Sequence, residues 1–147
     1  MKVDKLKYKT TPINELKRIK PIWAIEENIC QLLDKSLDPN YGRFVFLSIN
    51  TNDLIKNADF KEVDNNTLFT GDDKNDMRIS QILNFWENEK CIDPPSIGYS
   101  IESKKIEFYD GRHRTKLSFF LKLKEIPVAI EKDDMEKIKL LLKAPIL

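Results

Sequence analysis

Apolar residues recur along the chain with two different periods, and the changes of period separate helices from strands. The first forty residues have helical spacing, with a helix expected to start at Thr11 and Pro12. After Pro21 a second helical face is predicted, formed by Ile22, Ile25, Ile29, Leu32 and Leu33. Asp38–Gly42 has the composition of a helix stop. Residues 1–42 are therefore predicted to form a helical N-terminal extension that packs on the rest of the chain.

The middle of the chain predicts one strand, a long loop and one helix. Arg43–Ile49 is rich in Phe, Val and Ile and is expected to be a strand, with a turn at Asn50–Asp53. Residues 56–74 are polar and weakly patterned, which is typical of a long surface loop. A helix is expected from about Asp76 to the Pro94-Pro95 pair. Its buried face would consist of Ile79, Ile82, Leu83 and Trp86.

The last third predicts a hairpin followed by a helix, a strand and a helix. Residues 97–101 and 106–109 are the hairpin strands, and Gly111 breaks the second of them. A helix follows, with Leu117, Phe120, Leu121 and Leu123 on one side. Residues 126–130 form a further strand, and a last helix carries Met135, Ile138, Leu141 and Leu142 before Ala144 and Pro145. The sum is an α+β (mixed α/β) domain over residues 43–147, preceded by the helical extension.

The strongest chemical signal lies where the second hairpin strand passes into a helix. The residues there are Asp110, Gly111, Arg112, His113, Arg114 and Thr115. A helix N-terminus carries partial positive charge and unpaired N–H groups, so stability alone favours Asp, Ser or Glu over basic residues. A bound anion removes that conflict, and a glycine lets it approach the backbone. The pattern indicates a site for phosphate or another anion. In the alternative, Asp110 caps the helix and the arginines point into solvent.

This motif, the apolar helix after it and the strand Ile126–Ile130 with its central Pro127 resemble the ParB/sulfiredoxin superfamily. Members of that fold carry a D-G-x-H-R-like pattern followed by a helix and a Val-Pro-Val-like strand. Upstream, the strand Arg43–Ile49, the helix from Met77 and the segment Asp93–Ile97 fall in the family's order, so the resemblance covers roughly residues 43–131. It implies a small mixed sheet flanked by helices.

The resemblance also implies roles for individual residues. In sulfiredoxins the His and Arg of the motif contact nucleotide phosphates, and the residue before the His is a catalytic Cys. Arg112 stands at that position here, so sulfiredoxin chemistry is not expected. The implied phosphate ligands are Gly111, Arg112, His113, Arg114 and Thr115, assisted by Arg78 from the preceding helix. Serine kinases of this fold need an acidic base near the first strand, which points to Asp53, and the candidate catalytic residues are thus Asp110, His113 and Asp53.

Composition narrows the partners of such a site. With 25 Lys and Arg residues against 24 Asp and Glu, the formal net charge is +1, which gives no general attraction to nucleic acid or to an anionic membrane. No apolar run is long enough to span a bilayer. Cys30 and Cys91 are too few for a disulfide framework, so a cytoplasmic protein is expected. The acidic stretch Gly71–Asp76 has oxygen ligands that suit Mg²⁺, but a solvent-facing loop with an N-cap from Asn75 or Asp76 is favoured, and no metal ligand is assigned.

Three functions remain open. The leading hypothesis is a nucleotide-binding protein that transfers or hydrolyses a phosphoryl group, with ATP, ADP or CTP as ligand and Mg²⁺ as a companion. The second is a nuclease-like or ParB-type nucleic-acid module, for example in a bacterial toxin; ParB-type members bind CTP through a related turn, but the chain has no room for their downstream DNA-binding domain. The third is a binding or immunity protein that contacts a protein partner through residues 56–74.

Overall fold

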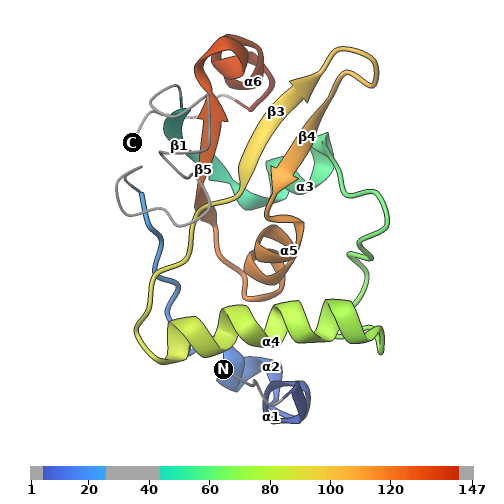
Figure 1. Ribbon diagram of the computed structural model, residues 1–147, viewed down its shortest axis with the longest axis vertical. Coiled ribbons are helices and arrows are strands. Elements are labelled where there is room, and N and C mark those ends of the chain that lie inside the picture. Colours follow the sequence, from blue (N-terminus) through green and yellow to red (C-terminus); the bar gives the residue numbers. More distant parts are fainter. Residues whose placement is uncertain (1–4, 26–43, 143–147) are drawn as a thin grey trace, which may run out of the picture.

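The computed structural model describes residues 5–25 and 44–142, and they form a mixed sheet with helices around it (Figure 1). The sheet has five strands in the order β1-β5-β3-β4-β2. β1 and β5 are antiparallel, β5 and β3 parallel, β3 and β4 antiparallel, and β4 and β2 parallel. The strands are β1 Phe44–Asn50, β2 Ala58–Asp59, β3 Ser96–Ser100, β4 Lys105–Asp110 and β5 Glu125–Glu131. The predicted α+β class is confirmed.

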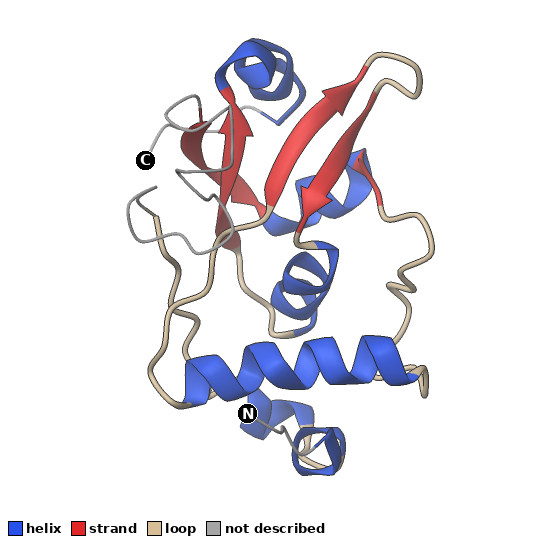
Figure 2. Ribbon diagram, viewed as in Figure 1, coloured by secondary structure: helices blue, strands red, loops and turns tan. Residues whose placement is uncertain are grey.

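The helices surround this sheet and continue below it (Figure 2). They are α1 Lys5–Lys9, α2 Ile13–Leu16, α3 Thr51–Asn57, α4 Asp73–Glu87, α5 Arg112–Phe120 and α6 Met135–Leu142, with a short 3₁₀ turn, η2, at Lys132–Asp134. α3 and α6 contact strands of the sheet, α5 lies between the sheet and α4, and α1 packs beneath α4 (Figure 1). No helix in the described ranges is long and apolar enough to cross a membrane.

Two apolar clusters hold these layers together. One lies between the sheet and the helices α3 and α6, and includes Leu47, Ile97, Ile106, Val128 and Ile138. The other joins α4 and α5 to the N-terminal segment, and includes Tyr8, Leu16, Leu83, Trp86 and Leu117. The described part of the N-terminal extension therefore shares a core with the helices that carry the candidate site.

The hairpin and the strand after it were placed correctly from the pattern. β3 and β4 pair with each other, and β5 spans the predicted residues 126–130 with one more at each end. β1 covers the predicted first strand except for Arg43, which lies outside the described residues. Alternation explains these successes, because every second residue of β5 from Ile126 to Ile130 faces a buried core.

The turn predicted at Asn50–Asp53 is wrong, because these residues begin the helix α3. The side chain of Asn50 accepts a hydrogen bond from the backbone N–H of Asp53 at 3.1 Å and so caps the helix. α3 and β2 occupy residues up to 59, and α4 starts at 73. The long loop predicted over residues 56–74 is therefore restricted to residues 60–72.

The predictions around α4 and the N-terminal segment also need correction. α4 begins at Asp73 and is capped by Asp72, whose side chain accepts from the N–H of Asn75, so neither Asn75 nor Asp76 is the cap. It ends at Glu87, well before the prolines. The first residues after Pro21 do not form the predicted helix. Trp23 instead pairs with Ile92 in an isolated bridge. The rest of that predicted helix, the stop at Asp38–Gly42, Cys30, and the pair Ala144 and Pro145 lie outside the described residues.

Candidate functional site

A cavity of about 490 Å³ opens between α4, the start of α5, residues 62–72 and residues 91–93. That volume lies in the range of small-molecule sites in proteins. Its basic lining comes from Lys74, Arg78, Arg112, His113 and Arg114. Its carboxylates are Glu62, Asp64, Asp72, Asp93 and Asp110. The fold thus brings the predicted residues Arg78, Asp110, Gly111, Arg112, His113 and Arg114 to one cavity.

Gly111 shapes the entry to α5. Its φ is +103°, in the left-handed region that glycine tolerates best, and a Cβ atom there would lie 2.6 Å from the Cα of Pro95. No described side chain caps α5 through this residue, whereas Asp72 caps α4. The N-cap residue of α5 therefore supplies no side-chain acceptor to the first N–H groups of the helix, and an anion bound there would supply one.

The guanidinium group of Arg112 is hydrogen-bonded at one nitrogen and lacks a described partner at another. Its Nη2 donates to the carbonyl of Phe108 at 3.2 Å, and its Cζ lies 5.8 Å from the centre of the Phe108 ring. Its Nε–H is buried and has no hydrogen-bond partner among the residues that the structure describes. Because buried donors are nearly always paired, this N–H is an unmet donor in a residue that lines the cavity.

His113 is surrounded by positive charge. Burial, and after it the charges of Arg78, Lys116, Lys74 and Arg112 in that order of influence, lower its pKa to about 4. The imidazole is therefore neutral at pH 7 and offers one donor and one acceptor. An anion entering the cavity would offset the surrounding charge and raise the pKa of His113.

Arg114 and Asp110 form an ion pair across one helical turn. Arg114 Nη2 lies 3.0 Å from Asp110 Oδ2, and Arg114 Nη1 donates to the carbonyl of Asp93 at 3.4 Å. Arg114 thus fixes the strand-to-helix turn to the segment after α4, and Asp110 is not a helix cap. Asp110 remains 45% exposed in this pair and is one of the residues that line the cavity.

Two of the predicted residues lie away from the cavity lining. Thr115 is fully buried, and its hydroxyl donates to the Gly111 carbonyl at 3.0 Å, so the predicted phosphate contact of this hydroxyl has no support in the geometry. Asp53 lies in the first turn of α3 and is not among the described residues that line the cavity. The cavity that holds the basic cluster therefore does not include the predicted base.

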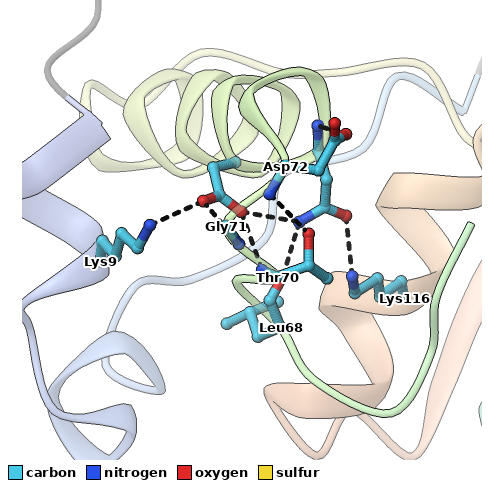
Figure 3. Close-up of polar contacts among 8 residues, drawn as sticks. Lys9, Leu68, Thr70, Gly71, Asp72 and Lys116 are labelled. Carbon is cyan, nitrogen blue, oxygen red and sulfur yellow. Dashed lines mark hydrogen bonds and ion pairs between the residues drawn. The ribbon is translucent and has the colours of Figure 1, made fainter.

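Two neighbouring residues that sequence reasoning treated as solvent-facing hold the rim of the cavity together (Figure 3). The carboxylate of Asp76 accepts from the N–H of Thr70 at 3.0 Å and of Gly71 at 3.2 Å. It also accepts from Asn75 Nδ2 and from Lys9 Nζ, both at 2.9 Å. Burial raises the pKa of Asp76, but these hydrogen bonds outweigh it and hold the pKa below its ordinary value.

Asn75 extends the same network to α5. Its Nδ2 also donates to the Leu68 carbonyl at 3.0 Å, and its Oδ1 accepts from Lys116 Nζ at 2.8 Å. Lys116 is fully buried, and burial lowers the pKa of its amine, while Asp64 and Asp76 oppose that shift. Figure 3 shows Lys9 from α1 on one side of this network and Lys116 from α5 on the other. One feature of the sequence could have revealed this network: Lys116, next to Leu117, lies on the side of the helix that was predicted to be apolar.

The described residues provide no ready-made metal centre, because no group of three or more His, Cys, Asp or Glu side chains among them could hold an ion. Comparison with protein-family models, with curated proteins and with solved structures finds no match to this chain.

Proposed function

We propose that this protein binds the phosphate groups of a nucleotide at the N-terminus of α5. One observation carries the proposal: Arg112 and His113, from the first turn of a helix whose N-cap is a glycine, line the same cavity as Arg78 from α4. Arg78 and Lys74 are exposed on that wall, and the Arg112 Nε–H is buried without a described partner. Backbone N–H groups, the neutral imidazole and these cations form a donor set that suits phosphate oxygens.

The resemblance to the ParB/sulfiredoxin fold supports the same reading, because the D-G-x-H-R-like motif of that superfamily contacts nucleotide phosphates. In this chain we assign phosphate binding to the backbone of Gly111–Arg114 and to the side chains of Arg78, Arg112 and His113. Arg114 acts by positioning the turn. A Mg²⁺ ion would arrive with the nucleotide, which bridges such ions through its own phosphate oxygens.

The carboxylates of the cavity favour a small ligand over a polymer. Glu62, Asp64 and Asp72 are exposed on the same rim as the basic residues. A nucleic acid would bring phosphates past these acidic groups, and its binding needs several neutralised phosphates. A mononucleotide brings only its own few phosphates to this rim. Nucleic-acid binding, with or without cleavage, is therefore the alternative to be tested and not the leading proposal.

Hydrolysis or transfer of the phosphoryl group is a further step that Asp110 would have to support. With Asp53 outside the lining, Asp110 is the predicted carboxylate that remains beside His113 in the cavity. It could orient a water or an acceptor hydroxyl next to the bound phosphate. Phosphate release from bound nucleotide, measured in wild type and in Asp110→Asn, tests this step separately from binding.

Calorimetric titration tests the binding proposal. ATP, ADP and CTP are titrated with and without Mg²⁺ into wild type, Arg78→Gln and Arg18→Gln. Arg18 is exposed beyond α2 and does not line the cavity, so it controls for the loss of one arginine charge. We expect Arg78→Gln to weaken binding roughly 10- to 100-fold, as the loss of a charge-assisted hydrogen bond does. The proposal is wrong if wild type binds none of the three nucleotides.

A further inference from the structure

One face of α4 changes its chemistry along the length of the cavity. Lys74, Arg78, Gln81, Ile82 and Phe85 recur at helical spacing and all line it. The first two are basic and the last two apolar. Phe85 lies seven positions after Arg78, which is about 10 Å along a helix axis. The cavity therefore has a charged end and an apolar end.

The segment after α4 also reaches from one end of the cavity to the other. The N–H of Lys90 donates to the carbonyl of Phe85 at 2.8 Å, and the carbonyl of Asp93 accepts from Arg114 at 3.4 Å. Cys91 and Ile92, which line the cavity, connect these two points. The segment thus runs from beside Phe85 to the basic cluster and adds apolar surface between them.

Phe85 is an aromatic side chain outside the buried core, and Lys90 Nζ lies 6.0 Å from the centre of its ring. Phe85 is 39% exposed, whereas its neighbours Leu83 and Trp86 are buried in the cluster that holds α4. Gln81 lies one turn before it, is exposed, and carries an amide that both donates and accepts hydrogen bonds. An exposed ring beside a polar amide at the apolar end of a phosphate cavity suits a flat heteroaromatic group.

We infer that the ligand is a nucleoside phosphate whose base stacks on Phe85 while its phosphates lie at His113, with Gln81 facing the edge of the base. The inference rests on the proposed function and adds the part of the ligand that is recognised. Inorganic phosphate or a simple sugar phosphate would fill only the charged end. A ligand that reaches both Arg78 and Phe85 must span about 10 Å and carry both parts.

The test compares ligands with and without a base. ATP, CTP and tripolyphosphate are titrated calorimetrically into wild type, Phe85→Ala, Phe85→Leu and Phe85→Tyr. Ile101→Ala serves as the control, because Ile101 is 73% exposed on the hairpin and lies outside the lining. Thermal melts establish that each variant is folded.

We expect Phe85→Ala to weaken the tighter-binding nucleotide roughly tenfold or more, and Phe85→Leu nearly as much, since loss of base stacking has that effect. Phe85→Tyr should bind within about threefold of wild type, and tripolyphosphate should bind every variant alike. The inference is overturned if Phe85→Ala leaves nucleotide affinity unchanged, or if it weakens tripolyphosphate equally. Should wild type bind neither nucleotide nor tripolyphosphate, the proposed function itself fails.

Discussion

At the scale of single residues, His113 is the group whose charge depends most on what fills the cavity. Burial and four neighbouring cations depress its pKa to about 4, against about 6.5 in an unfolded chain. Between these values the unfolded state binds more protons than the folded state. Folding stability is therefore lost through this group as the pH falls from about 6.5 towards 4.

His113→Gln removes this titration, so it should flatten the dependence of stability on pH. Between pH 7.5 and pH 5 we expect wild type to lose about 1–2 kcal/mol more unfolding free energy than His113→Gln. Urea unfolding of both proteins at the two pH values measures the difference. Equal losses in the two proteins would show that His113 titrates normally and that the positive surroundings described here are wrong.

At the scale of elements, the strand-to-helix turn depends on Gly111 for two separate reasons. Gly71 provides a matched control, because its φ is also positive, at +89°, but a Cβ there meets nothing within 4 Å. Gly71→Ala should cost about 1 kcal/mol from backbone strain alone. Gly111→Ala adds a clash with the backbone of Pro95 and should cost roughly 2–4 kcal/mol, with loss of phosphate binding. Urea unfolding measures both losses. Equal losses of unfolding free energy in the two variants would contradict the close approach of residue 111 to Pro95.

The connection between α1, the cavity rim and α4 depends on the Asp76 carboxylate. Asp76→Asn keeps the shape but loses the charge that four donors share, and should lower the unfolding free energy by about 2–4 kcal/mol. Lys9→Gln removes only the exposed donor and should cost less than about 1 kcal/mol. Chemical denaturation of the two variants checks the order. A larger loss in Lys9→Gln would mean that the α1 contact, and not the buried network, dominates.

At the scale of the whole molecule, the N-terminal segment is part of the core that supports the site. Tyr8 and Leu16 are 2% exposed against α4, and the Tyr8 hydroxyl donates to Glu87 at 2.8 Å. Removal of residues 1–25 should therefore destabilise the protein by several kcal/mol, since each such side chain contributes about 1.5–3 kcal/mol. A thermal melt of the shortened chain measures this. An unchanged melting temperature would make the segment a detachable extension.

The sequence predicted four of the five strands, the turn at Gly111 and most of the basic cluster, because each depends on local pattern or local chemistry, whereas β2 fell inside the predicted loop. Alternation marks β5, and a glycine followed by basic residues marks the start of α5. The Asp76 network escaped prediction because its partners are up to 67 residues apart in the chain. The position of Asp53 also depends on how α3 packs, which no local pattern records. Phe85 looks like any helical apolar residue until the core is seen to leave it exposed.

The central claim is that phosphate binds at the first turn of α5, and amide NMR reads that location directly. Pyrophosphate is added to ¹⁵N-labelled protein, with chloride at matched ionic strength as the control. The account predicts that the backbone amides of Arg112, His113 and Arg114 shift first and saturate together, and that Arg78→Gln weakens the response. Saturable shifts that centre elsewhere, for example on the hairpin lysines 104 and 105, or no saturable shift at all, would contradict it.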